Sequence, residues 1–226
     1  MKKFAVIVAG GMGQRMGVEI PKQFLLLRGK PVLWYSINTF LLAYDDMQVV
    51  LVLPLAHLES GIELRNSFVN KDRIQIISGG VTRFHSVQNG LKAIKDQSVV
   101  FVHDGVRCLV SKDLIKKCYE QAIEKGSAVP AVAASDSIRI ADGEKNVVAD
   151  RDNIRMVQTP QTFTSEIILP AFQQEFNHSF TDEATVVEAT GKEIFLIEGE
   201  YNNLKITRPI DLLIAEKILE ERSAFE

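Results

Sequence analysis

A glycine-rich loop with two cations stands near the start of the chain. Gly10, Gly11 and Gly13 follow a short apolar run, and Arg15 and Lys22 come soon after. Glycines have no Cβ atoms, so such a loop can bring backbone N–H groups against an anion. Two cations beside it would complete a site for a triphosphate. These residues suggest that the segment holds a nucleotide and activates its phosphorus.

Two well-known phosphate-binding patterns do not match this loop. No Gly-Lys-Ser/Thr follows it, as a Walker-type loop requires. The dinucleotide fingerprint also does not match, because Met16 occupies the position of its third glycine. The next glycine, Gly17, follows one position later. The segment also fits a plain strand-to-loop turn whose cations are solvated. From the glycine pattern alone, both interpretations stay open.

Two further loops carry residues of suitable chemistry. Gly79 and Gly80 follow a predicted strand over residues 73–77, and Asp104 follows another over residues 99–102. Each of the three loops therefore lies just beyond the carboxyl end of a predicted strand. In open α/β sheets that edge is where ligands bind. Asp104 also fits an ordinary turn aspartate, which is a common role for this residue type.

The elements that must position these loops alternate along the chain. β-branched apolar runs predict strands, and apolar residues at helical spacing predict helices. The predicted strands cover residues 4–8, 49–53, 73–77, 99–102, 128–133 and 192–197. The predicted helices cover residues 32–43, 55–68, 83–94, 112–124, 165–176, 182–190 and 209–222. The alternation implies crossover connections, and so an α/β fold with a Rossmann-like open, mostly parallel sheet flanked by helices.

Several helix ends carry their own signals. Ser111 is a good N-cap for the helix over residues 112–124, which Gly126 should terminate. Thr181 is a candidate N-cap for the helix over residues 182–190. The closing helix is predicted to be amphipathic, with these residues at helical spacing: Ile210, Leu213, Ile214, Lys217 and Ile218.

Residues 134–156 break the alternating pattern. They are polar and contain Asp142-Gly143, a strong hairpin turn signal, so two short strands are predicted. A lone hairpin is marginally stable at best. The segment is therefore predicted to be a β-arm that packs on a second subunit, although a mobile surface hairpin is the alternative. Residues 1–226 are predicted to form a single domain, with residues 134–156 as its β-arm subdomain.

The composition limits the possible classes of protein. The chain has 226 residues, of which 46% are hydrophobic, and a net charge of −3. This suits one domain with a full core and makes nucleic acid an unexpected partner. Two cysteines make neither a disulfide framework nor a zinc site, which fits the cytoplasm. The first apolar run is too short for a signal peptide or a membrane span.

Motifs spread over nearly the whole chain resemble one family, the 2-C-methyl-D-erythritol 4-phosphate cytidylyltransferases of the non-mevalonate isoprenoid pathway. The matching stretches are Ala9-Gly-Gly-Met-Gly-Gln-Arg-Met16, Pro21-Lys-Gln23, Gly79-Gly-Val-Thr-Arg-Phe-His-Ser-Val87, His103-Asp104, Asp136-Ser137, Thr159-Pro-Gln161 and Asn203-Leu-Lys-Ile-Thr-Arg-Pro209. The resemblance implies that CTP and methylerythritol phosphate give a cytidine diphosphate alcohol and pyrophosphate, with Mg²⁺ as the cofactor. It also implies a homodimer joined through the 134–156 arm.

The resemblance further implies a role for individual residues. Catalysis would fall to Arg15, Lys22 and Lys205, and Asp104 would hold the metal. The implied nucleotide-binding residues are Ala9, Gly10, Gly11, Met12, Gly13, Gly80, Arg83, Ser86, Asp104 and Gly105. The implied residues for the polyol phosphate are Ser137, Arg151 and Thr207. A neutral imidazole has no duty in phosphate displacement, so His103 is interpreted as structural or peripheral.

Other functions remain as alternatives. The CTP half of a cytidylyltransferase for ribitol 5-phosphate would look the same, and residues 135–157 carry the difference. Here Asp150-Arg151-Asp152-Asn153-Ile154 is more like the methylerythritol enzymes. A nucleotide-binding protein without chemistry would be expected to lose the cations beside the phosphates, and the glycine pattern argues against an NAD-dependent oxidoreductase.

Overall fold

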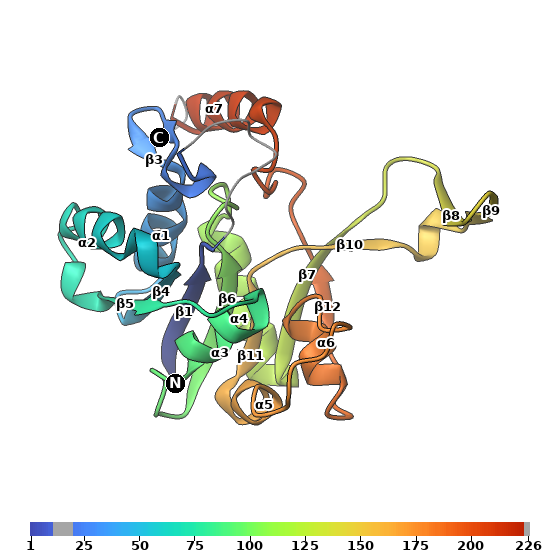
Figure 1. Cartoon of the computed structure of the whole chain (residues 1–226), viewed down its shortest axis with the longest axis horizontal. Coiled ribbons are helices and arrows are strands. Elements are labelled where there is room, and N and C mark those ends of the chain that lie inside the picture. Colours follow the sequence, from blue (N-terminus) through green and yellow to red (C-terminus); the bar gives the residue numbers. More distant parts are fainter. Residues whose placement is uncertain (11–19, 224–226) are drawn as a thin grey trace.

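An eight-stranded sheet forms the centre of the molecule. The computed structural model describes residues 1–10 and 20–223. Seven strands follow the order β10-β7-β11-β6-β1-β4-β5, and β12 pairs with β7 off this path (Figure 1). The strands at one end, β6, β1, β4 and β5, are mutually parallel. Their bounds are β1 Lys2–Val8, β4 Met47–Leu53, β5 Ile74–Ser78 and β6 Ser98–Asp104.

The other end of the sheet is mixed. Strand β11 lies antiparallel between β6 and β7, β10 is antiparallel to β7, and β12 is parallel to β7. The bounds are β7 Ser127–Ala133, β10 Arg155–Val157, β11 Gln161–Thr164 and β12 Leu196–Glu198. Two small hairpins complete the strands of the described residues, namely β2 Leu26–Leu27 with β3 Lys30–Pro31, and β8 Ile138–Asp142 with β9 Lys145–Ala149.

Helices cover both faces of the sheet. The α-helices are α1 Val32–Ala43, α2 Leu58–Asn66, α3 Arg83–Leu91, α4 Lys112–Lys125, α5 Ser165–Ala171, α6 Glu183–Glu188 and α7 Pro209–Ser223. Single 3₁₀ turns are η2 Lys22–Phe24, η3 Leu55–His57, η4 Lys71–Arg73 and η5 Arg151–Asn153. Helices α1, α2 and α4 pack in the core on one face, and α3, α5 and α6 pack on the other. The predicted α/β class with a mostly parallel sheet is confirmed.

Strand β1 shows why the sequence folds in this way. Ala5 and Ile7 lie in the core under α1 and α4, whereas Val6 and Val8 lie in the core under α3. Successive side chains of a strand point to opposite faces, so a continuous apolar run is what a strand covered on both sides requires. The run ends at Val8, and the glycine loop begins at the sheet edge.

Helix ends agree with the cap signals at some positions and differ at others. Ser111 caps α4 by accepting a hydrogen bond from the Leu114 N–H at 2.9 Å, and Gly126 ends it with φ of 87°. The prediction that Thr181 is the N-cap of α6 was wrong. Asp182 caps it instead, in a capping box with Thr185. The predicted helix over 165–176 already ends at Ala171.

Helix α7 is present as predicted, but its apolar spacing does not mark the buried face. Ile210 and Leu213 are 54% and 64% exposed, whereas Ala215 is fully buried. Leu212, Ile218 and other neighbours pack beside Ala215 against β2 and the 204–206 segment. The helix thus carries apolar residues on two sides. In the described part of the chain, the structure contains no helix long and apolar enough to span a bilayer.

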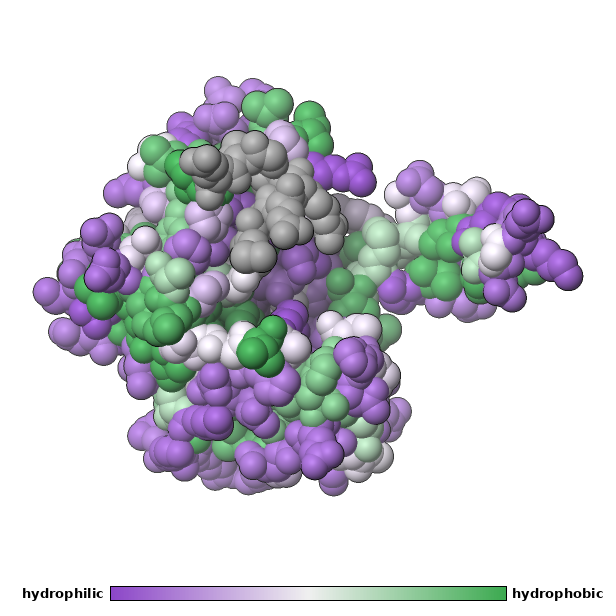
Figure 2. Space-filling view, in the orientation of Figure 1, coloured by the Kyte–Doolittle hydropathy of each residue, from purple (hydrophilic) through white to green (hydrophobic). Residues whose placement is uncertain are grey.

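The predicted hairpin forms and projects from the body. Strands β8 and β9 pair from Ile138 opposite Ala149 to Asp142 opposite Lys145, and Gly143 takes a positive φ of 57° in the turn. Beyond the pairing of β7 with β10, the hairpin and the segments that lead to it stand clear of the central sheet (Figures 1 and 2). Ile140, Val147 and Val148 on it are exposed apolar side chains. We refer to residues 134–156 as the arm.

Candidate active site

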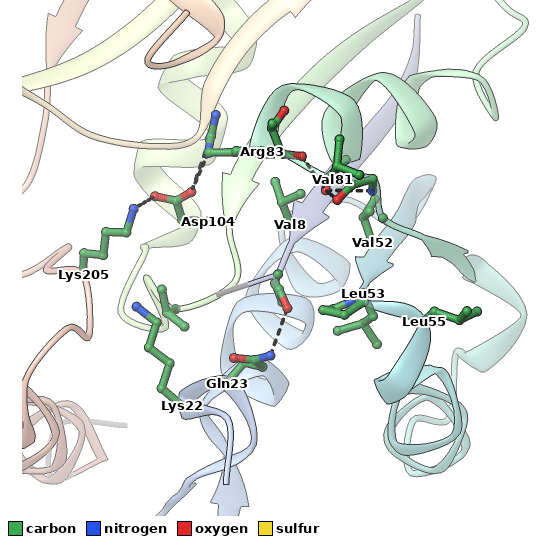
Figure 3. A pocket seen from close by; sticks show the side chains of 18 residues that line it. Val8, Lys22, Gln23, Val52, Leu53, Leu55, Val81, Arg83, Asp104 and Lys205 are labelled. Carbon is green, nitrogen blue, oxygen red and sulfur yellow. Dashed lines mark hydrogen bonds and ion pairs between the residues drawn. The ribbon is translucent and has the colours of Figure 1, made fainter. Parts of the chain in front are cut away.

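A cavity of about 730 Å³ opens at the carboxyl edge of the parallel strands. It is lined by the residues that follow β1, β4, β5 and β6, because the ends of parallel strands meet at one edge. Two lysines from distant segments, Lys22 and Lys205, close another side (Figure 3). Gly10, Gly79, Gly80 and Asp104, which the sequence placed in three loops at one edge, do meet there.

Most of the described candidate residues line this cavity. Those that do are Ala9, Gly10, Lys22, Gly80, Arg83, Ser86, Asp104 and Lys205. Gly105 is buried directly beside it, where its N–H donates to the Val8 carbonyl oxygen at 2.9 Å. Gly11, Met12, Gly13 and Arg15 lie outside the described residues. The structure therefore brings two candidate catalytic lysines and the described candidates for nucleotide binding to one cavity.

The backbone of the 79–86 turn is held tightly. The Gly80 N–H donates to Ser86 Oγ at 3.1 Å, and that hydroxyl donates to the Thr82 carbonyl oxygen at 2.9 Å. A Cβ atom on Gly80 would lie 2.4 Å from the Cβ of His85. Glycine is therefore required here by close approach to α3. Ser86 fixes the shape of the turn that forms the cavity wall.

Asp104 is the centre of charge in the cavity. It ends β6, is 8% exposed, and its Oδ1 accepts from Arg83 Nε and Nη2 at 3.3 and 3.2 Å. Its Oδ2 lies 2.8 Å from Lys205 Nζ and 3.9 Å from Arg107 Nε. Burial alone would raise the pKa of Asp104, but Arg83, Lys205 and Arg107 outweigh it and hold the pKa well below its usual range. The carboxylate is therefore ionised at neutral pH.

Lys22 and Lys205 approach the same space from different parts of the chain. Lys22 starts the 3₁₀ turn η2, and its Nζ donates to the Ile206 carbonyl oxygen at 3.1 Å. This bond ties the segment after the glycine loop to the segment that carries Lys205. In Figure 3 both lysines lie on the side of the cavity that Asp104 faces. Two cations on one side suit a polyanionic ligand.

His103 does not line the cavity, which agrees with its interpretation as structural or peripheral. It is fully buried, and burial lowers its pKa to about 4, so the imidazole is neutral at pH 7. Its Nδ1 lies 3.1 Å from Thr159 Oγ1 and its Nε2 lies 3.1 Å from the Arg107 carbonyl oxygen. Thr159 Oγ1 also accepts from the Asp104 N–H at 3.0 Å. His103 thus helps to fix Thr159, whose hydroxyl holds the backbone of Asp104.

The residues predicted for the polyol phosphate do not line the cavity of their own chain. Ser137 and Arg151 are exposed on the arm, and Arg151 Nη1 donates to the Ser135 carbonyl oxygen at 3.2 Å. Thr207 lies next to Ile206, and its hydroxyl donates to Asp211 Oδ2 at 2.9 Å. Their roles stay predictions.

The structure also adds residues that the sequence reasoning missed. Gln23 is buried in the cavity wall, where its Nε2 donates to the Ala9 carbonyl oxygen at 3.0 Å. Glu183 is buried and forms an ion pair with Arg83. Gln23 stands in a motif beside Lys22, which was a usable signal. Arg83 and Glu183 are 100 positions apart, so no local pattern links them.

The cavity offers one carboxylate of the kind that a magnesium ion takes as a ligand. In residues 1–10 and 20–223 no cluster of three His, Cys, Asp or Glu side chains could hold a metal alone. Mg²⁺ commonly takes one or two carboxylates and completes its shell with substrate phosphates and water. The ionised Asp104 at the edge of an open cavity is a carboxylate of this kind.

Comparison with known proteins gives one consistent result. The family model of 2-C-methyl-D-erythritol 4-phosphate cytidylyltransferase matches residues 4–221. The protein of that name from Phocaeicola vulgatus is 42% identical over 219 residues, which cover 97% of this chain and 100% of the relative. That from Porphyromonas gingivalis is also 42% identical, with 96% and 98% covered.

Solved structures agree with the sequence relatives. The crystal structure of 2-C-methyl-D-erythritol 4-phosphate cytidylyltransferase from Francisella tularensis has a TM-score of 0.78 and 31% identity, and covers 96% of this chain and 99% of that one. The enzyme from Thermus thermophilus has a TM-score of 0.72 and 30% identity, with 95% and 98% covered. The similarity in both sequence and fold extends over nearly the full length of each chain.

Proposed function

Because the chain belongs to the 2-C-methyl-D-erythritol 4-phosphate cytidylyltransferase family, we infer that the cavity at the sheet edge binds CTP. The chain is a nucleotidyltransferase of isoprenoid biosynthesis, which joins CTP and 2-C-methyl-D-erythritol 4-phosphate into 4-diphosphocytidyl-2-C-methyl-D-erythritol and pyrophosphate. The observation that best supports the cavity as the site is the convergence of Lys22, Lys205 and Asp104 on it.

The reaction is a substitution at the α-phosphorus of CTP. A phosphate oxygen of the acceptor forms the new P–O bond, the bond between the α-phosphorus and its bridging oxygen breaks, and pyrophosphate leaves with that electron pair. No proton has to be moved, so the protein must position two anions and stabilise charge. Lys22 and Lys205 would supply that charge, together with Arg15. Preorganised donors of this kind usually make the largest single contribution to the stabilisation of a transition state.

Asp104 is proposed to hold magnesium. The ion would neutralise phosphate charge and orient the triphosphate. In this structure Asp104 Oδ2 is paired with Lys205 Nζ at 2.8 Å. A triphosphate in the cavity would offer Lys205 an alternative anion, which would release this oxygen. Lys205 and Asp104 are thus proposed to separate as CTP binds.

The base and ribose are assigned to the backbone around the cavity. Small residues at Ala9, Gly10 and Gly80 leave N–H and C=O groups within reach of a flat ring. Among the described residues, no atom lies within 4 Å of a Cβ built on Gly10. Ser86 is proposed to act on the base mainly through the turn that it fixes, because its hydroxyl already bonds within that turn.

The arm is proposed to join two chains into a homodimer. Its exposed Val147 and Val148 lack a covering surface within the described part of their own chain. Ser137 and Arg151 would then reach the acceptor phosphate in the partner's cavity, where the arginine fork suits a phosphate group. Residues 134–156 would serve as a β-arm of a single domain. Location in the cytoplasm also stays a prediction.

The assignment is tested by offering purified protein CTP, Mg²⁺ and one acceptor at a time. Pyrophosphate release should require 2-C-methyl-D-erythritol 4-phosphate and should stay at background with ribitol 5-phosphate. Lys205→Ala should lower kcat by at least about tenfold because a charged donor near the reacting phosphorus is lost. Lys192→Ala, which removes an exposed lysine elsewhere, is the matched control. Turnover with ribitol 5-phosphate alone would reassign the acceptor.

A further inference from the structure

One buried carboxylate beside the cavity has no role in the chemistry described above. Glu183 is the first residue of α6 and is 1% exposed. Its two oxygens accept from Arg83, with Nη2 to Oε2 at 3.0 Å and a second bond from Nη1 to Oε1. Burial raises the pKa of Glu183 in spite of Arg83. A buried ion pair is seldom favoured over well-packed apolar residues for stability alone, so its presence calls for a reason.

Arg83 stands between two carboxylates. One edge of its guanidinium bonds Asp104 Oδ1, and the other bonds Glu183. Asp104 faces the cavity and is also held by Lys205 at 2.8 Å, whereas Glu183 lies behind Arg83 in the interior. The two acids therefore differ in which ligands can reach them. Asp104 can exchange partners when an anion or a cation enters, and Glu183 cannot.

Both ends of the Arg83–Glu183 pair lie on well-anchored elements. Gln161 Oε1 accepts from the Ala184 N–H at 2.8 Å, and Gln161 Nε2 donates to Asp182 Oδ2 at 2.9 Å, so β11 holds the start of α6. Phe84, next to Arg83, stacks on Phe172 with ring centroids 4.9 Å apart. Side chains locked in this way can hold a functional group in place.

We propose that Glu183 is a positioning residue that fixes Arg83 at the cavity wall independently of Asp104. Arg83 would then stay in place for the nucleotide when Lys205 turns to the triphosphate and leaves Asp104 Oδ2 for the metal. Without the charge of Glu183, the guanidinium would depend on Asp104 alone and would compete with the metal for it. This inference rests on the proposed binding of CTP in the cavity.

The test is Glu183→Gln, which keeps the shape and removes the charge. We expect the dissociation constant for CTP with Mg²⁺, measured by calorimetry, and the KM for CTP to rise by at least about tenfold, the loss expected for a hydrogen-bonded charge. The KM for the polyol phosphate should change less than about twofold. Glu188→Gln, on the exposed side of the same helix, is the matched control and should leave the dissociation constant and the KM for CTP unchanged. Lower thermal stability with unchanged CTP binding would overturn the proposal.

A double-variant comparison separates this inference from the proposed function. In an Arg83→Met background, Glu183→Gln should have no further effect on CTP affinity, because it acts through Arg83. In Arg83→Met the buried Glu183 loses its cation and takes up a proton, since burial already raises its pKa. Neither this variant nor the double variant then holds an unpaired ion there, so the two can be compared even where Glu183→Gln alone unfolds. A further loss of affinity of more than about threefold in the double variant would overturn the positioning role. Unchanged CTP affinity in Arg83→Met would instead remove Arg83 from the nucleotide site.

Discussion

The proposed role of Lys22 depends on where the fold places its side chain. Its backbone belongs to a 3₁₀ turn after Pro21, and its Nζ bonds the Ile206 carbonyl oxygen at 3.1 Å beside the segment of Lys205. The ammonium group thus stands at the junction of two segments that are far apart in the sequence. A lysine on a surface turn would be a solvated charge, but this one lines the cavity that is proposed to bind CTP.

We predict that Lys22→Ala lowers kcat about 100-fold, because one donor lost from a site of developing charge costs about 3 kcal/mol. The melting temperature should change little, since the lysine is partly exposed. Steady-state kinetics at saturating CTP and acceptor measure the effect. Lys71→Ala, an exposed lysine in η4, serves as the control. A wild-type kcat in Lys22→Ala would remove this lysine from catalysis.

Among the described glycines, Gly80 is the one whose replacement the structure forbids most clearly. A Cβ there would meet the His85 Cβ at 2.4 Å and the His85 backbone carbon at 3.0 Å, so neither neighbour can move without shifting α3. We predict that Gly80→Ala raises the KM for CTP by at least about tenfold through displacement of the cavity wall. Calorimetric titration with CTP would check the same change. Native affinity in this variant would show that the turn does not contact the nucleotide.

Among the elements, helix α7 has the most informative start. Asp211 Oδ2 accepts from the Thr207 and Arg208 N–H groups, both at 2.7 Å, and from the Thr207 hydroxyl at 2.9 Å. It satisfies donors that a helix start leaves open and fixes Thr207, a candidate substrate contact. Burial would raise the pKa of Asp211, but the bonds from Thr207 and Arg208 outweigh it and lower the pKa.

We predict that Asp211→Ala destabilises the fold by about 1 kcal/mol at pH 7, the usual cost of a lost helix cap. Because the folded pKa lies below the unfolded one, this contribution is complete above about pH 4 and is lost as the pH falls through the folded value. The free energies of unfolding of the wild type and of Asp211→Ala, measured with urea, should therefore differ less at pH 3 than at pH 7. Glu216→Ala, exposed in the same helix, is the control. An equal difference at both pH values would contradict a role for the charge.

The sequence predicts most of the elements because their signals are local. The apolar run of β1, the Ser111 cap and the Asp142-Gly143 turn each depend on residues that are neighbours in the chain. The exposed face of α7 was not predictable, because its apolar residues lie on two sides and only tertiary packing selects one. Glu183 was missed for the same reason, because its role depends on Arg83, which lies far from it in the sequence.

At the scale of the whole molecule, the cavity and the arm divide the predicted site. Lys22, Lys205 and Asp104 meet in one chain, whereas Ser137 and Arg151 stand on an arm that projects from it (Figure 2). Protein dimers usually have twofold symmetry, so an arm that reaches one partner is matched by an arm from that partner. Each complete site would then combine the cavity of one subunit with the arm of the other.

This arrangement predicts complementation between two impaired variants. Lys22→Ala damages the cavity and Arg151→Ala damages the arm, so a heterodimer of the two would hold one doubly impaired site and one intact site. After equal amounts are unfolded and refolded together, half of the dimers would be mixed, and about a quarter of all sites would be intact. The assay is pyrophosphate release at an acceptor concentration below the wild-type KM. The same mixture without unfolding is the control, and activity equal to the mean of the two variants alone would show that the arm serves its own subunit.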